Sequence, residues 1–297
     1  MNGARGLMLL TALLLGACGG TPEQQAPAPT EQQSLDRAAR LAFGQRHYAQ
    51  AATLYRATLE AALAGDDPRA IIDARFNLAV AQMNLGDYPA ALDQATQADA
   101  ERTRRGLGAD PGLELLRATI HFRAGDLDAA TAALEPLTRN GDLPALTRAK
   151  AHFLAGLVAA DRGDADALRL HLARLETLAS TETAVDRIEL NGRLAGMRGD
   201  VDQALGLLDR AAAMRSLEQD YRGMVRVLAS AGELAARHGR ERLAGNYLLR
   251  AGRSAAQRDA PEARAWLEHA RVLGERVGDE ALALEAASIL RELDAGQ

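Results

Sequence analysis

The 297-residue sequence is poor in cysteine and aromatic residues, and each shortage excludes a class of protein. The single cysteine, Cys18, cannot form a disulfide within the chain or bind a metal together with a second thiolate. Aromatic residues make up 3% of the chain, whereas alanine and leucine are abundant, which favours closely packed helices over sheets. The formal net charge of -5 provides no general attraction to phosphate backbones, so we expect no nucleic-acid partner.

Signatures of catalysis and of cofactor binding are also missing. Lys150 is the only lysine and does not follow a glycine, which excludes a Walker phosphate loop, and no HExxH motif occurs. The six histidines show no metal-ligand spacing, and we expect each on a helix surface. Gly-Asp-x-Asp segments begin at Gly125, Gly163 and Gly199, and we interpret their aspartates as helix caps rather than calcium ligands. We therefore predict no metal, no cofactor and no catalytic residue.

Residues 1–17 are predicted to be a removable targeting signal. Arg5 precedes an apolar run, residues 7–15, that is too short to span a bilayer. The run leads into the sequence LGAC, which ends at Cys18 and resembles the lipobox of bacterial lipoproteins. The resemblance implies that Cys18 becomes the acylated N-terminus and anchors the protein in a membrane. An ordinary secretory signal with a chance cysteine is the alternative.

The residues after Cys18 predict where the folded part is held. Gly19 replaces the aspartate that often retains lipoproteins in the inner membrane, so the resemblance implies the outer membrane of a Gram-negative host, facing the periplasm. Residues 19–33, GGTPEQQAPAPTEQQ, contain no large apolar side chain to bury. In polyproline form they would reach about 45 Å. We therefore predict a lipidated tether over 18–33 and a folded domain over 34–297.

A helix-breaking glycine recurs in this domain with a period near 39 residues. The glycines are Gly86, Gly125, Gly163, Gly199, Gly239 and Gly278. A small or apolar residue lies five positions after each glycine, and a small residue lies seven positions before most of them. Two helices should therefore meet closely at each turn. The unit that runs from Asn77 through Gly86-Asp87-Tyr88 to Leu92 resembles the tetratricopeptide repeat.

This resemblance implies an all-α fold, a right-handed superhelical solenoid of about seven tetratricopeptide-like hairpins between Leu35 and Leu293. A first unit lacks the glycine, and we place Arg46 at its turn position. The units exceed the family length of about 34 residues, which predicts longer helices or loops, most clearly at 106–112. Because one hairpin cannot bury its own apolar face, neighbouring hairpins must stack and leave a concave groove.

In this family the groove is lined by positions about thirteen, ten, six, three and two residues before the turn glycine. Applied to every unit, this register predicts an apolar stripe in the first four units and mixed charge further on. All four phenylalanines fall on it. The predicted partner-binding residues are Phe43, Phe76, Met83, Leu115, Phe122, Phe153, Leu157, Arg193, Arg226 and Arg237. The alternatives are that the apolar side chains are core, and that the many arginines of the sixth unit form solvated helix faces rather than a site for an acidic peptide.

The sequence thus predicts a membrane-anchored periplasmic scaffold or adaptor that binds envelope proteins or peptides. In architecture it resembles the repeat lipoproteins that act as pilotins and those that gather cell-wall hydrolases or synthases. A different class, a cell-wall-active or glycan-binding enzyme, would need clustered carboxylates in the groove, for which Asp186 and Glu189 are the best candidates. Self-association through the ends of the solenoid is a third possibility.

Overall fold

The structure, a computed structural model, describes residues 30–257 and 262–295, and these form fourteen α-helices without a strand. The helices are α1 (Glu31–Gly44), α2 (Tyr48–Ala64), α3 (Pro68–Leu85), α4 (Tyr88–Arg104), α5 (Pro111–Arg123), α6 (Leu127–Arg139), α7 (Ala145–Asp161), α8 (Ala165–Thr177), α9 (Ala184–Met197), α10 (Val201–Leu217), α11 (Tyr221–Arg237), α12 (Glu241–Ala256), α13 (Ala263–Arg276) and α14 (Glu280–Ala295). A short 3-10 helix (Thr181–Thr183) precedes α9. None of the described helices is long and apolar enough to cross a membrane.

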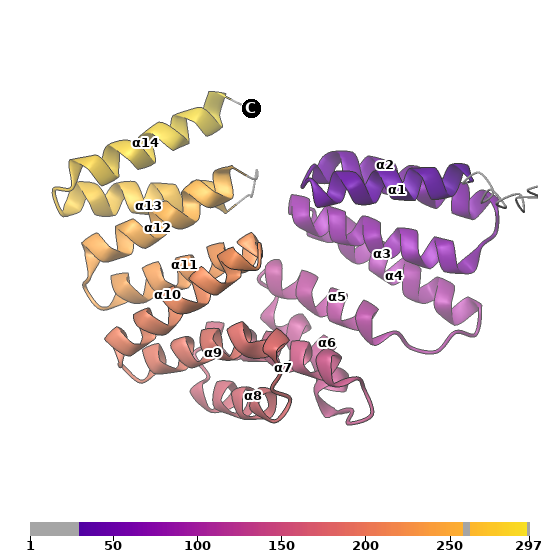
Figure 1. Cartoon of the computed structure of the whole chain (residues 1–297), viewed down its shortest axis with the longest axis horizontal. Helices are drawn as coiled ribbons and strands as arrows, with labels where there is room; N and C mark the ends of the chain where they lie inside the picture. The colour runs from indigo at the N-terminus through magenta and orange to yellow at the C-terminus, as the bar shows by residue number, and fades with distance from the viewer. Residues whose placement is uncertain (1–29, 258–261, 296–297) are drawn as a thin grey trace, which may run out of the picture.

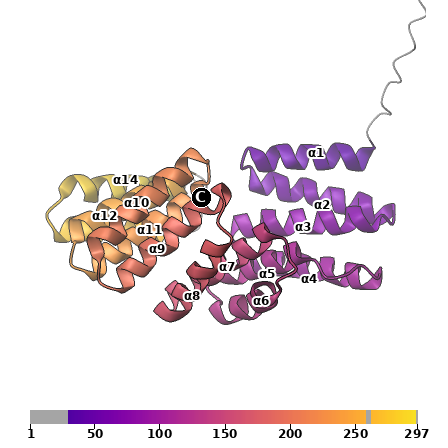
Figure 2. The ribbon, with the colours of Figure 1, turned by 60° about the horizontal axis from the view of Figure 1, so that its bottom comes forward.

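The helices pair into seven antiparallel hairpins, from α1 with α2 to α13 with α14, which confirms the predicted solenoid. Figure 1 shows the hairpins laid along a curve, so that the first and last units lie at its two facing ends. In Figure 2 the helices α1 to α5 stack on one side and α9 to α14 on the other. The odd-numbered helices from α5 to α11 line the concave side.

The predicted turns are confirmed by backbone geometry. All six turn glycines have a left-handed φ, between 67° at Gly278 and 86° at Gly199. This conformation ends one helix and reverses the chain, and glycine adopts it without steric cost. Arg46 takes the same conformation, with φ 65°, which confirms its assignment to the first turn. The predicted long loop at 106–112 also forms, because α4 ends at Arg104 and α5 begins at Pro111.

Small side chains allow the helices to approach closely. Five positions after their turn glycines, Ala91, Ala130, Leu168, Ala204 and Ala244 have no exposed surface. Seven positions before the turns, the small residues lie against large ones. A Cβ added at Gly192 or Gly232 would meet the leucine of its own hairpin, at 3.0 Å from Leu208 Cγ and 2.7 Å from Leu248 Cγ. The alanine-rich composition therefore has a direct packing consequence: helices stack through Ala and Gly contacts.

The boundary between the tether and the domain differs from the prediction by three residues. Thr30 caps α1, because its Oγ1 accepts a hydrogen bond from the Gln33 backbone N–H at 3.2 Å and Gln33 Oε1 accepts one from the Thr30 N–H at 3.0 Å. This capping box makes residues 31–33 the first turn of α1 rather than the end of the tether. The predicted signal 1–17, Cys18 and residues 19–29 lie outside the described residues.

Candidate functional site

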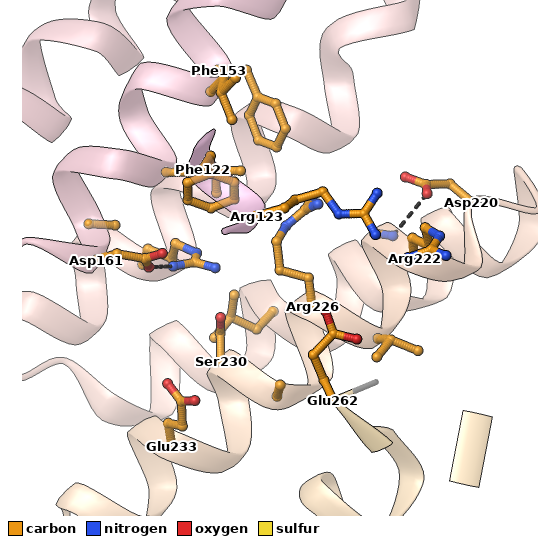
Figure 3. Close-up of a pocket in the computed structure, with 18 of the residues that line it drawn as sticks. Phe122, Arg123, Phe153, Asp161, Asp220, Arg222, Arg226, Ser230, Glu233 and Glu262 are labelled. Carbon is orange, nitrogen blue, oxygen red and sulfur yellow. Dashed lines mark hydrogen bonds and ion pairs between the residues drawn. The ribbon is translucent and has the colours of Figure 1, made fainter. Parts of the chain in front are cut away.

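A cavity of about 1130 Å³ opens on the concave side. Helices α5, α7, α9 and α11 form most of its wall, and residues of α2, α10, α12 and α13 add to it. Figure 3 shows phenylalanines on one side of this space and charged side chains of α11 on the other. The two sides differ because the large apolar side chains at the groove positions come from α5 and α7, whereas α9 and α11 supply Arg193, Arg226 and Arg237.

The apolar wall contains four predicted groove residues: Leu115 and Phe122 from α5, and Phe153 and Leu157 from α7. They lie ten, three, ten and six residues before their turn glycines, so the helical register brings them to the same face. Leu157 is only 1% exposed and forms the floor, while the two phenylalanines are half-buried. Part of this wall is therefore also core, in line with the alternative interpretation of these side chains.

The charged wall contains the three predicted arginines, Arg193, Arg226 and Arg237. The Arg193 guanidinium bonds to Asp161 across the α7–α9 interface, with Nη1 at 2.6 Å from Oδ1. The Arg226 side chain donates two hydrogen bonds of 2.9 Å to the carboxylate of Glu189, and its Cζ lies 5.5 Å from the centre of the Phe153 ring. Arg226 is thereby fixed in place by one carboxylate and one aromatic ring.

A buried ion network supports this wall from behind. Glu189 is fully buried and accepts hydrogen bonds from Arg215 and Arg226. Arg215 also bonds to Asp186 at 2.8 Å and to Asp220 at 2.7 Å. Burial alone raises the pKa of Glu189, but Arg226, Arg215 and Arg193 outweigh it and hold the pKa at about 2. Glu189 is therefore ionised, and it links α9 to α10 and α11.

The network includes Asp186 and Glu189, the two carboxylates considered for a cell-wall-active or glycan-binding enzyme. Neither Asp186 nor Glu189 lines the cavity, and both are engaged by arginines. The two best candidates for an acid–base pair therefore act as structural residues in this fold.

Four cationic side chains in the cavity wall have no carboxylate within 4 Å among the described residues. They are Arg123 in α5, Lys150 in α7, and Arg222 and Arg237 in α11. Over the described lining, seven cationic side chains face four carboxylates, although the whole chain has a formal net charge of -5. Of those carboxylates, Asp161 and Asp220 are already paired with arginine. The cavity is therefore a region of excess positive charge in an acidic protein.

Three predicted groove residues lie elsewhere. Phe43 packs edge-on against Tyr48, with ring centroids 5.3 Å apart, near the turn between α1 and α2. Met83 is 8% exposed, and it and the half-buried Phe76 belong to the cluster that joins α3, α4 and α5. In the first two units these positions thus face neighbouring helices, and the curvature of the solenoid separates them from the cavity.

The sequence interpretation missed other residues that the cavity contains. Arg123 and Lys150 lie two and thirteen residues before their turn glycines, so the register itself identifies them. Tyr48, Arg222 and Trp266 occupy no register position. They reach the cavity because the solenoid curves, and no local sequence pattern predicts this curvature.

Side-chain contacts close the solenoid between the first and sixth units. The Arg46 guanidinium lies 4.1 Å from the centre of the Tyr221 ring, and its Nη2 is 3.5 Å from the backbone oxygen of Gln219. Nearby, Arg222 Nη2 donates to the backbone oxygen of Asn84 at 2.7 Å. Arg46 and Gln219 are 173 residues apart in the sequence, and Arg222 and Asn84 are 138 apart. The concave groove is thus bridged at this edge.

The histidine prediction was wrong at His152. His152 is 7% exposed, and its Nδ1 lies 3.2 Å from Nδ1 of His171 between α7 and α8. Burial lowers the pKa of His152 to about 4, and the charges of His171, Arg174 and Arg148 act in the same direction. Burial also lowers the pKa of His171. The two rings therefore share one hydrogen bond in neutral form.

The aspartates of the Gly-Asp-x-Asp segments mostly act as predicted. Asp126 and Asp164 cap their helices by accepting from the backbone N–H of Ala129 at 3.0 Å and Ala167 at 2.9 Å. Asp200 makes no such side-chain hydrogen bond.

The arginines of the sixth unit separate into two groups. Arg222, Arg226 and Arg237 face the cavity. The others that the structure describes lie on or before α12 and pair with carboxylates: Arg240 with Asp202, Arg242 with Asp279, Arg250 with Asp209 and Arg253 with Glu285. Arg258 lies outside the described residues.

Comparisons with known proteins agree with this architecture. Neither the known protein families nor the curated proteins contain a match to the sequence. Among solved structures, a tetratricopeptide repeat protein from Parabacteroides merdae is similar over 86% of this chain and 98% of its own, with 14% identity and a TM-score of 0.52. This chain has the tetratricopeptide-repeat fold. A Rap protein complexed with competence and sporulation factor is similar to this repeat solenoid over 91% of the present chain and 77% of the Rap chain, with 16% identity and a TM-score of 0.65.

Proposed function

We propose that this tetratricopeptide-repeat solenoid is a binding scaffold that takes up a polypeptide segment of a partner protein in the cavity between α5, α7, α9 and α11. The observation that carries the proposal is the division of one cavity into an apolar wall with Phe122 and Phe153 and an arginine-rich wall with Arg226. Such a pair of surfaces suits a segment that has apolar side chains on one edge and polar ones on the other.

Two further observations support a binding role. Arg226 is held by Glu189, so its guanidinium is ordered before a partner arrives and less side-chain entropy is lost on binding. The similar Rap protein is complexed with competence and sporulation factor, so a solenoid of similar fold forms a complex.

We also propose that the scaffold is a lipoprotein anchored through Cys18, facing the periplasm from the outer membrane and serving an envelope assembly or cell-wall process. The lipobox-like sequence before Cys18 supports this. Radiolabelled palmitate should enter the full chain and not a Cys18→Ser variant. Equal labelling of both proteins would contradict lipidation at this residue.

Photo-crosslinking tests the binding role directly. A benzophenone analogue of phenylalanine at position 153, inside the cavity, should crosslink to a polypeptide in cells that produce the full chain. The same analogue at position 170 is the control, because Leu170 is 55% exposed on α8 and does not line the cavity. Products that are identical from both positions, or absent from position 153, would argue against a cavity-bound partner.

Stacking of solenoid ends is a second candidate. Leu41 on α1 and Leu284 on α14 are 62% and 66% exposed, so both terminal helices present an apolar side chain. Light scattering should then give a mass above 31.5 kDa, the mass of the full chain, that falls when Leu284 is replaced by glutamate.

A further inference from the structure

Two guanidinium groups from non-adjacent repeats meet at the edge of the cavity. Arg123 is the last residue of α5, and Arg222 is the second residue of α11. Both donate to Asn84, which is 7% exposed: Arg123 Nη1 to the side-chain Oδ1 at 3.4 Å, and Arg222 Nη2 to the backbone oxygen at 2.7 Å. One buried residue of the second repeat therefore positions cations from the third and sixth repeats.

The charges of these two groups are poorly compensated. Neither has a carboxylate within 4 Å among the described residues. Burial lowers the pKa of Arg123, and the nearby charge of Arg222 lowers it further, while Tyr88 and Glu262 only partly oppose this. Figure 3 shows Arg123 extending from beside Phe122 toward Arg222. An anion placed here would relieve the repulsion between the Arg123 and Arg222 guanidinium groups.

We propose, resting on the peptide-binding function above, that Arg123 and Arg222 form a two-point site for a carboxylate of an acidic polypeptide segment. The bound carboxylate bridges the third and sixth repeats. Each guanidinium keeps N–H donors that Asn84 does not occupy, and guanidinium groups bind carboxylates through paired, charge-assisted hydrogen bonds. The apolar wall begins next to this site, because Phe122 precedes Arg123, so acidic and apolar side chains should alternate in the bound segment.

The size and the charge of the cavity favour a polypeptide over a small anion. About 1130 Å³ exceeds the roughly 300–1,000 Å³ of ordinary small-molecule pockets. Lys150 and Arg237 line other parts of the cavity without a carboxylate partner, so more than one acidic side chain finds a cation. The excess positive charge of the lining supplies the electrostatic complementarity.

Fluorescence anisotropy with the full chain tests the proposal. The probe is a labelled mixture of peptides of about ten residues in which Leu, Ile, Val or Phe alternates with Glu, and the comparison mixture has Gln in place of Glu. The variants are Arg123→Gln, Arg222→Gln and the double variant. Arg242→Gln is the matched control, because Arg242 belongs to the same repeat as Arg222, is 67% exposed and pairs with Asp279 outside the cavity. Circular dichroism melting checks that every variant is folded.

The expected result is that the Glu mixture binds the wild-type protein about tenfold or more tightly than the Gln mixture. Each single variant should weaken binding of the Glu mixture about tenfold, or about 1.4 kcal/mol. Because both arginines hold one carboxylate, the double variant should lose less than the product of the single losses. Arg242→Gln should bind like the wild type.

Several results would overturn this site while leaving the scaffold function intact: equal binding of both mixtures, no loss in the single variants, or losses that multiply as for independent sites. A melting temperature raised as much by inorganic phosphate alone as by the Glu mixture would assign the site to a free anion and overturn it too. If neither mixture binds the wild type and no crosslink forms from position 153, the peptide-binding function fails together with the site.

Discussion

Replacing Glu189 by glutamine tests the buried ion network that holds the charged wall of the cavity. Glu189 has no exposed surface and accepts four hydrogen bonds, from Nε and Nη2 of Arg215 and of Arg226, at 2.6 to 3.1 Å. Glutamine keeps the shape but removes the charge, leaving guanidinium groups buried without their main partner. Breaking a buried pair in this way costs about 3–5 kcal/mol. Because Arg215 keeps Asp186 and Asp220, we expect a loss of about 3 kcal/mol.

The lowered pKa of Glu189 leads to a stability loss of similar size. Its value of about 2, against an ordinary 4.5, corresponds to about 3 kcal/mol of preference for the ionised form in the folded state. Because the pKa is lower in the folded than in the unfolded state, this stabilisation is complete above about pH 4.5 and is lost as the pH falls toward 2. The difference between wild type and Glu189→Gln should therefore shrink over that range.

Urea unfolding followed by circular dichroism at neutral pH and at several acidic pH values measures both effects. Glu233→Gln is the control, because Glu233 is exposed on the cavity side of α11, and it should change stability by less than about 0.5 kcal/mol. A loss below about 1 kcal/mol for Glu189→Gln at neutral pH, or a difference that does not change with pH, would refute the reasoning.

Three further predictions concern the turns, the histidine pair and the closing contact. Gly163→Ala places a side chain at φ 74° and should destabilise the protein by about 1 kcal/mol in urea unfolding, whereas Gly206→Ala, inside α10 with open space around its Cβ, should stabilise it by roughly 0.5–1 kcal/mol. Because the pKa of His152 is lowered from 6.5 to about 4 in the folded state, its contribution to stability is present above pH 6.5 and lost toward pH 4; a His152→Leu variant should lack this part of the pH dependence. Arg46→Gly suits the left-handed φ of 65° and removes the contact with Tyr221. Small-angle X-ray scattering should therefore show a larger radius of gyration with little change in thermal stability. An unchanged radius would mean that this contact does not hold the first and sixth units together.

The repeat fold could be predicted from the sequence because it depends on interactions between residues close in the chain. A glycine every 39 residues or so, small residues on either side of it and apolar periodicity between the turns are local signals. They correctly predicted seven hairpins, the positions of the turns and the turn role of Arg46. The same register brought Leu115, Phe122 and Phe153 to the cavity wall.

The tertiary structure decided what the register could not. The curvature of the solenoid placed Phe43 and Phe76 outside the cavity and brought Tyr48 into it. Packing of α7 against α8 brought His152 to His171, although the two have no ligand-like spacing in the sequence.

The sequence by itself determined the hairpins, their number and the chemical character of each helix face, because these follow from neighbours within one repeat. Only the tertiary structure decided which cations of the cavity wall lack a carboxylate partner. It also decided that distant repeats touch across the concave groove, as Arg222 does with Asn84. Small rotations between successive repeats add up along the solenoid, so contacts between distant repeats depend on the whole stack. No short segment of the sequence fixes the total rotation, and this is the physical reason why local patterns could not predict these contacts.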